Sequence, residues 1–280
     1  MTLVGARTAR LAAGLARVHR ILPRACGYVH TAMFVNTREL GSFPDDLCPL
    51  GASRVPLTGV PRVAAAYVWG DGEASVLALH GWGADSTAMS AVVQHALAHD
   101  ETVVCFDAPG HGISPGSQAT ITDYARATSE VLQRFPSVHT VVAHSLSALA
   151  AVSAVAETPQ AHVRNIVLLA PACSLSGVLE RWAAQRRLPR GVVDGIYREL
   201  AARDGIPVLH WDIRTLSMPA SVRLQVLHDP ADDIVPIDDS YLIAAAVAGA
   251  RFLDTGVHRG IVASNEMRSA LSACLTARSG

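Results

Sequence analysis

The sequence contains no lysine, because all 23 basic residues among its 280 are arginines. Without lysine the chain cannot form a Schiff base with a carbonyl substrate, and it has no P-loop lysine to bind phosphate. The 24 acidic residues bring the formal net charge to −1. A nucleic acid partner requires a clustered surplus of cations, so we expect none. The arginine- and alanine-rich composition is typical of GC-rich coding sequence, which makes arginine clusters weak signals.

Cysteines are few. The five are odd in number and form no CxxC pair; they are Cys26, Cys48, Cys105, Cys173 and Cys274. This usage is typical of reduced thiols rather than of a disulfide framework or a zinc site, and it predicts a cytoplasmic protein. No metal or organic cofactor is expected, because no ligand spacing suggests one.

Long hydrophobic runs are also missing. No apolar stretch reaches the roughly 18 residues of a membrane span, so we expect no stable membrane insertion. The first two dozen residues contain five arginines and no acid, as a transit-type peptide would. We favour the alternative, an amphipathic helix within an N-terminal segment (residues 1–52) that packs on the core. The oligomeric state stays open.

From Arg54 onward, short β-rich runs alternate with helical patterns. The runs are apolar and bounded by Gly, Pro and Asp, as expected of strands buried on both faces. They cover residues 54–57, 63–69, 75–79, 102–106, 139–143, 165–169, 222–228 and 251–254. Helical patterns cover residues 86–98, 121–135, 146–157, 241–247 and 265–277. This order predicts an α/β fold, a mainly parallel twisted sheet with helices on both faces, over residues 53–280.

One interval breaks the alternation. Residues 171–219 show no strand signal but two helical stretches, near 178–187 and 192–203. An insertion after the carboxyl end of a strand lies over the crevice where such sheets bind ligands. We therefore interpret residues 172–218 as a small helical cap. Its apolar residues and interspersed arginines suit an apolar acyl chain with an anionic end.

Ser145 lies where a β-branched run stops and an alanine-rich helical run begins, in Val-Val-Ala-His-Ser-Leu-Ser-Ala. A serine at a sharp strand-to-helix turn is the geometry of a nucleophile elbow. The small neighbours at the two flanking positions are Ala143 and Ser147 instead of glycines. Ser145 could instead only cap the helix that begins at Leu146, since serine is a favoured N-cap.

Other predicted strand ends also carry chemical groups. His80-Gly81-Trp82-Gly83 follows one strand, and its glycines allow backbone amides, that of Trp82 included, to approach a substrate oxygen. An aspartate-rich loop, residues 229–236, follows another strand, and His258 comes after the last. Serine, then acid, then histidine is the chain order of α/β-hydrolase triads.

Together these motifs resemble the α/β-hydrolase superfamily, in particular bacterial esterase-like serine hydrolases with a helical cap, from about Arg54 to the C-terminus. The resemblance implies that Ser145 is the nucleophile and His258 the base. It implies Asp232 as the acid, because two residues and then Val-Pro follow it; Asp233 is the substitute if the register is off by one. It implies that the backbone amides of Trp82 and Leu146 form the oxyanion hole.

The neighbouring polar residues have structural interpretations. We expect Asp107 and His80 to support loops, and His111 and His144 to serve packing or hydrogen bonding. Cys173 has no elbow, so core packing is expected. Ser147 adds bulk where strand and helix are closest, and it could place a second hydroxyl beside the nucleophile.

The resulting expectation is hydrolysis of a carboxylic ester or related acyl bond in a small-molecule substrate, through an acyl-Ser145 intermediate. Thioesterases and C–C-bond hydrolases use the same triad, so the sequence leaves them open. A non-catalytic ligand-binding protein of the same fold is the alternative from outside the enzymes.

Overall fold

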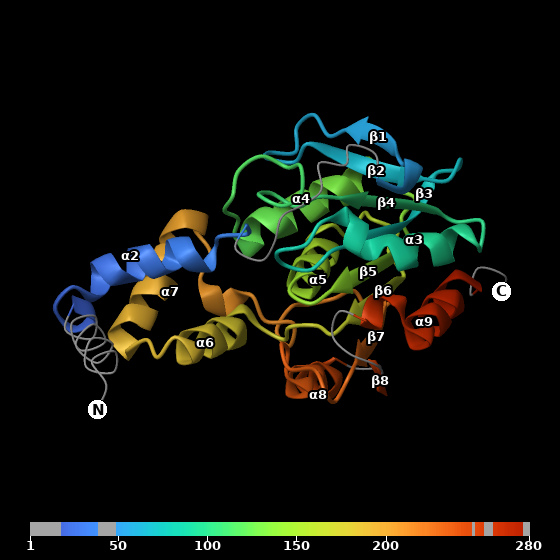
Figure 1. Ribbon diagram of the computed structural model, residues 1–280. Helices are drawn as coiled ribbons and strands as arrows, with labels where there is room; N and C mark the ends of the chain where they lie inside the picture. The colour runs from blue at the N-terminus through green and yellow to red at the C-terminus, as the bar shows by residue number, and fades with distance from the viewer. Residues whose placement is uncertain (1–17, 39–48, 248–249, 255–259, 277–280) are drawn as a thin grey trace, which may run out of the picture.

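The computed structural model describes residues 18–38, 49–247, 250–254 and 260–276 (Figure 1). Within them an eight-stranded sheet has the order β1-β2-β4-β3-β5-β6-β7-β8. Strands β3 to β8 pair in parallel, whereas β1 and β2 form an antiparallel edge next to β4. The strands are β1 Ser53–Pro56, β2 Ala65–Trp69, β3 Ala74–Leu79, β4 Thr102–Phe106, β5 Thr140–His144, β6 Asn165–Leu169, β7 Arg223–His228 and β8 Arg251–Asp254.

Helices cover both faces of the sheet. Alternate residues of each strand point to opposite faces, so the apolar runs supply two cores. Leu77 and Val141 pack on one face with α4 (Ile121–Arg134), α5 (Ser147–Glu157) and α8 (Ile237–Ala246). Val76 and Val142 pack on the other face with α3 (Ser90–Leu97), which the 3-10 turn Ser86–Met89 precedes, and α9 (Asn265–Thr276). The predicted α/β class and every predicted strand are confirmed, with ends shifted by two residues at most.

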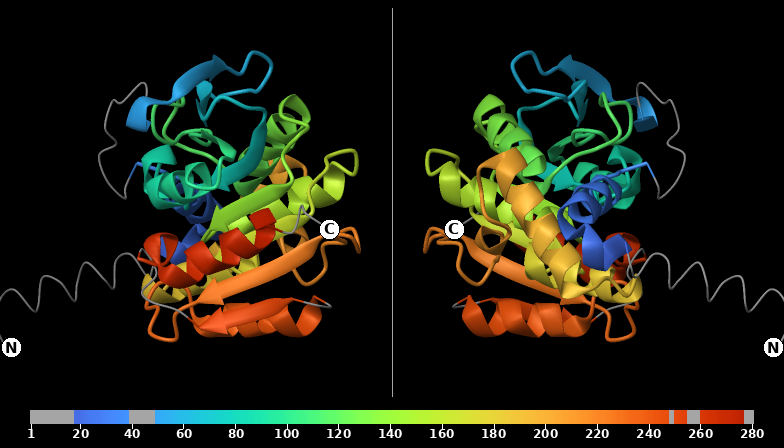
Figure 2. Two further views of the ribbon diagram at one scale, coloured as in Figure 1. Left: turned by 90° about the vertical axis from the view of Figure 1, so that its right-hand side faces the viewer. Right: turned by 90° about the vertical axis from the view of Figure 1, so that its left-hand side faces the viewer.

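A group of three helices lies beside the sheet, at the left of Figure 1. Two belong to the interval without strands, α6 (Leu175–Gln185) and α7 (Arg190–Asp204), followed by a 3-10 turn at Val208–His210. The third is α2 (Pro23–Phe34), which comes from the N-terminal segment and lies along α7 (Figure 2). We call these three the α2–α6–α7 group.

Glycines permit the contact between α2 and α7. A Cβ atom added at Gly27 would come within 2.7 Å of the Gly195 Cα atom, which is closer than real Cβ contacts. The two backbones therefore touch where the helices cross, and any larger side chain would separate them. Most of the predicted 1–52 segment lies outside the described residues.

A short strand-like pairing ties the end of α2 to the loop before α4. The Ala119 amide donates to the Val35 carbonyl at 3.0 Å, and the Thr37 amide donates to the Ser117 carbonyl at 2.9 Å. The Thr37 hydroxyl also donates to the Gly110 carbonyl. None of the helices in the described ranges combines the length and the apolar character that a membrane span requires.

Candidate active site

The turn from β5 to α5 holds Ser145 in an unusual backbone conformation. Its φ angle is +60°, in the left-handed region that a non-glycine residue rarely adopts, and such strain costs about 1–3 kcal/mol. The Ser145 amide donates to the Leu169 carbonyl of β6 at 2.8 Å, which fixes the turn against the sheet. Ser145 is half-buried and is one of the residues that line a cavity.

Ser147 has a different environment. It is fully buried, and its hydroxyl lies 2.8 Å from the His144 carbonyl and 3.2 Å from the Leu79 carbonyl, to which it donates. Its side chain is not part of the cavity lining. The second hydroxyl that the sequence allowed beside the nucleophile is therefore directed into the protein, toward the ends of β3 and β5.

The loop after β3 lies directly against this turn. A Cβ atom on Gly81 would come within 2.9 Å of the His144 Nδ1 atom and 3.4 Å of the Ser145 Cβ atom, so only glycine fits. His80 anchors the loop, since its Nδ1 donates to the Gly81 carbonyl at 2.8 Å and its Nε2 accepts from the Ala108 amide at 3.0 Å. Burial lowers the pKa of His80. The predicted supporting role of His80 is confirmed.

The loop after β4 is organised by Asp107. Its carboxylate accepts hydrogen bonds from the amides of Ser86 at 2.8 Å and Ile113 at 3.0 Å, which confirms the loop-supporting prediction. His111 donates from Nδ1 to the Pro109 carbonyl at 3.0 Å, and its ring lies edge-on to Trp82. Burial, with a smaller contribution from His80, lowers the pKa of His111 to about 3, so this imidazole is neutral.

The loop after β7 encloses the predicted acid. The Asp232 side chain is fully buried, and its Oδ1 accepts from the amides of Ile234 at 2.8 Å and Val235 at 2.9 Å. Its Oδ2 lies 3.5 Å from the Nε2 atom of His228, and that nitrogen donates to the Val235 carbonyl. His228 therefore fixes the Val235 carbonyl beside the carboxylate, a role that the sequence analysis missed.

The two neighbouring aspartates differ from Asp232. Asp229 accepts from the Ala231 amide at 2.9 Å within the turn, whereas Asp233 is exposed. His258, the predicted base, lies outside the described residues. Of the five predicted site residues, Ser145, Trp82 and Leu146 line one cavity, and Asp232 lies in the loop that brings Ile234 and Val235 to it.

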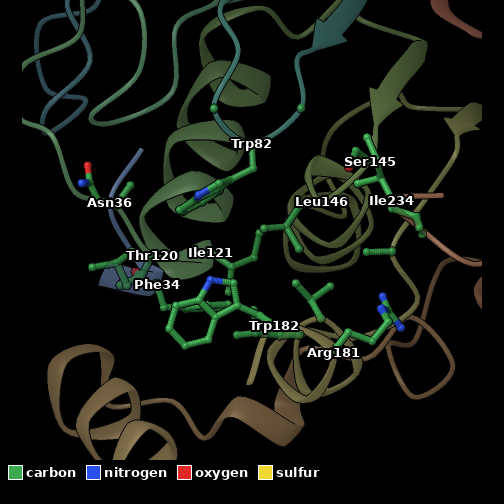
Figure 3. Close-up of a pocket in the computed structure, with 18 of the residues that line it drawn as sticks. Phe34, Asn36, Trp82, Thr120, Ile121, Ser145, Leu146, Arg181, Trp182 and Ile234 are labelled. Carbon is green, nitrogen blue, oxygen red and sulfur yellow. The ribbon is translucent and has the colours of Figure 1, made fainter. Parts of the chain in front are cut away.

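The cavity has a volume of about 660 Å³, within the usual range for small-molecule sites. Its lining residues extend from Ser145 and Ile234 to Phe34, Asn36 and Thr120 (Figure 3). We call the part beside Ser145 and Ile234 the serine end, and the part beside Phe34, Asn36 and Thr120 the helix end. Trp82, Leu146, Ile121 and Trp182 lie between the two ends. Because Phe34 and Asn36 come from the N-terminal segment, that segment forms part of the wall, which the sequence analysis did not anticipate.

The two arginines of the cavity wall, Arg181 and Arg186, already contact other side chains of the protein. Arg181 makes a two-pronged ion pair with Asp239 of α8, with both nitrogen–oxygen distances at 3.0 Å. The Arg186 guanidinium lies 4.2 Å from the centre of the Trp182 ring. The Arg181 charge is thus compensated within the protein, which removes one of the cations expected to bind an anionic substrate end.

Cysteine and metal chemistry are not favoured by the described residues. Burial, with a smaller contribution from Asp212, raises the pKa of Cys173 to about 12, so its thiol stays protonated and packs as predicted. Cys26, Cys105 and Cys274 are likewise free and buried. The described ranges contain no group of three or more His, Cys, Asp or Glu side chains suited to a metal ion.

Comparison with solved structures shows the same fold in proteins of low sequence identity. Alpha/beta hydrolase domain-containing protein 10 from mouse is 18% identical, with a TM-score of 0.59 over 81% of this chain and 97% of its own. An esterase from Pyrococcus furiosus is 19% identical, with a TM-score of 0.57 over 82% and 91%. A monoacylglycerol lipase from Paleococcus ferrophilus is 15% identical, with a TM-score of 0.55 over 75% and 98%.

The sequence itself identifies the protein family. No curated protein matches it significantly. Residues 76–270, from β3 to the middle of α9, match the family model described as the alpha/beta hydrolase family. This range includes the Ser145 turn, the loops after β3, β4 and β7, and two of the three helices of the α2–α6–α7 group. The chain therefore belongs to the alpha/beta hydrolase family.

Proposed function

We propose that this protein is a serine hydrolase that cleaves a carboxylic ester or related acyl bond through an acyl-Ser145 intermediate. The observation that carries the proposal is Ser145 itself. A strained, positive-φ serine at a strand-to-helix turn lines a cavity, while the serine two residues away is buried. Strain of this kind persists only where the surrounding structure enforces it, and it clusters at functional sites.

In the proposed reaction the Ser145 oxygen attacks the acyl carbon, and His258 takes the hydroxyl proton. The carbonyl electron pair moves onto oxygen, where the amides of Trp82 and Leu146 stabilise it, an effect commonly worth about 3 kcal/mol per donor. Collapse expels the alcohol, which takes the proton back from His258. Water then repeats the sequence on the acyl-enzyme. The buried Asp232 carboxylate orients the imidazole and stabilises its cation.

The cavity supports an apolar acyl group as substrate. Leu146, Ile121 and Trp182 provide hydrophobic surface between the serine end and the helix end. Trp182 is held by an edge-to-face contact with Phe34, with ring centres 5.3 Å apart. In this proposal the α2–α6–α7 group is the cap, and an acyl chain extends from Ser145 toward α2.

A fluorophosphonate probe tests the nucleophile directly, because it labels only an activated serine. We expect labelling of the wild type and a loss of at least about 10³-fold in Ser145→Ala. Ser147→Ala is the matched control, since it removes the adjacent hydroxyl outside the cavity, and it should label like the wild type. A folded wild type that does not react would leave a ligand-binding protein as the better description.

The acyl bond is identified by a second measurement on the same variants. We expect p-nitrophenyl esters to be hydrolysed faster as the acyl chain lengthens from acetyl until it fills the cavity. Acyl-CoA thioesters provide the comparison. A kcat/KM that is higher for thioesters at every chain length would replace the ester assignment by a thioesterase, with the same nucleophile.

A further inference from the structure

An exposed apolar surface covers the outer side of α2 and the helical turn just before it. Six large apolar side chains are between 37% and 60% exposed: Val18, Ile21, Leu22, Tyr28, Val29 and Met33. We call these six residues the α2 stripe. Val18 and Ile21 lie three residues apart in the helical turn before Leu22, and Val29 and Met33 lie four residues apart on α2, the spacings of one helix face. The opposite side of α2, with Cys26, Gly27 and Thr31, is buried. Clustered apolar exposure of this kind marks an interaction surface.

The part of the chain that carries the α2 stripe contains no acidic residue. Residues 1–38 contain six arginines and no acidic residue. Arg20 and Arg24 are exposed beside the stripe, and within the described ranges neither makes an ion pair. On the adjacent helix α7, Asp194 pairs with Arg190 and Glu199 with Arg203, whereas Asp204, at the far end of the helix, accepts hydrogen bonds from the Thr120 and Thr122 hydroxyls. A partner surface that is complementary in charge to Arg20 and Arg24 is therefore anionic.

The α2 stripe is also continuous with the cavity. Met33 is 37% exposed and lines the cavity together with Phe34. The apolar surface therefore leads from the outside of α2 to the helix end of the cavity. A second copy of this chain would bring the same uncompensated arginines face to face, whereas lipid phosphates would neutralise them.

We propose that α2 and the turn before it dock reversibly on the surface of an anionic lipid bilayer. The apolar side chains of the α2 stripe enter the boundary between headgroups and acyl chains, while Arg20 and Arg24 bind lipid phosphates. In this orientation the helix end of the cavity faces the membrane, so an apolar substrate reaches it without crossing water. Binding is independent of the chemistry proposed at Ser145.

The test is co-sedimentation of the full chain with vesicles. We expect at least about tenfold tighter binding to phosphatidylcholine vesicles that contain phosphatidylglycerol than to phosphatidylcholine alone, and a loss of this difference at high salt. The double variants Ile21→Ser/Val29→Ser and Arg20→Gln/Arg24→Gln should each bind about tenfold more weakly. Their positions are exposed, so unchanged thermal unfolding midpoints will show that the fold is retained.

The matched control is Tyr241→Ser/Leu242→Ser on α8, where two apolar side chains are 52% and 44% exposed next to acidic Asp238. This variant should bind vesicles like the wild type. The proposal is overturned if the wild type does not bind anionic vesicles, or if the α8 control loses as much binding as the α2 variants. It is also overturned if the chain is a dimer in solution that Ile21→Ser/Val29→Ser dissociates, because the stripe then belongs to a second copy.

Discussion

The two ends of the cavity are built in different ways. At the serine end, loops that follow β3, β5 and β7 are held by hydrogen bonds between backbone and buried polar groups, such as the Asp232 carboxylate and the His80 imidazole. At the helix end, the wall is built mainly by helices in contact, with α2 lying on α7 through paired glycines, and the pairing of residues 35–37 with 117–119 adds hydrogen bonds there. Hydrogen bonds fix the groups of the serine end in distance and direction, whereas the contact between α2 and α7 depends on the shapes of the two helices.

This difference separates chemistry from recognition. Groups at the serine end are placed by bonds of defined length, so a change there alters the reaction itself. The helix end depends on side-chain and backbone packing. A change there therefore alters which acyl chain the cavity accepts and how stable the contacts between the helices are. The comparison predicts that variants at the two ends affect different kinetic parameters.

The largest effect is expected at the acid. Asp232→Asn keeps the shape but removes the charge that orients the proposed base, so kcat/KM should fall by about 10³- to 10⁴-fold. Asp233→Asn, one position away and exposed, should change it by less than about twofold. Steady-state hydrolysis of a short ester measures both. A larger loss in Asp233→Asn would move the acid to that residue.

An intermediate effect is expected where α2 crosses α7. In Gly27→Ala the new Cβ atom meets the backbone of Gly195 at 2.7 Å, so the helices must separate, at a cost of about 3 kcal/mol in unfolding free energy. The KM for long acyl esters should rise, while kcat for the acetyl ester stays unchanged. In Gly191→Ala the new atom is 3.5 Å from its nearest neighbour, so this α7 variant should resemble the wild type. If kcat for the acetyl ester falls in Gly27→Ala but not in Gly191→Ala, a change at the helix end affects the reaction at the serine end, which contradicts the prediction.

The smallest effect is expected in the pH dependence of stability. The folded-state pKa of His111 is about 3, below its ordinary value of 6.5, so at intermediate pH only the unfolded chain takes up the proton. The contribution of neutral His111 to the free energy of unfolding is therefore complete above pH 6.5. It is lost as the pH falls, by about 2 kcal/mol between pH 7 and pH 5.

Urea unfolding at the two pH values measures this loss. His111→Gln should reduce the difference between pH 7 and pH 5, whereas His162→Gln, at an exposed position, should leave it as in the wild type. An unchanged pH dependence in His111→Gln would show that other groups dominate the acid sensitivity of the serine end.

The same contrast governs what could be predicted from sequence. The strands were predictable because their residues are buried on both faces and leave continuous apolar runs, as in β6. The Ser145 turn and the loops around it follow those strands in a fixed chain order. The contact between Gly27 and Gly195 leaves no such local pattern, because each glycine alone sits in an ordinary helix. The part that α2 takes in the cavity wall was therefore missed, and the position of His258 stays a prediction.

The pairing of residues 35–37 with residues 117–119 has a practical consequence. It makes the stretch from 18 to 38 an appended piece, joined to the remainder through hydrogen bonds to residues 110–119, ring contacts with Trp182 and the crossing with α7. Such a piece is a natural unit for fragment complementation. A chain that begins after it should lack one wall of the cavity yet keep the sheet, and a synthetic peptide of residues 18–38 should restore that wall in trans. Peptides of altered sequence would then vary acyl-chain preference without any change to the sheet.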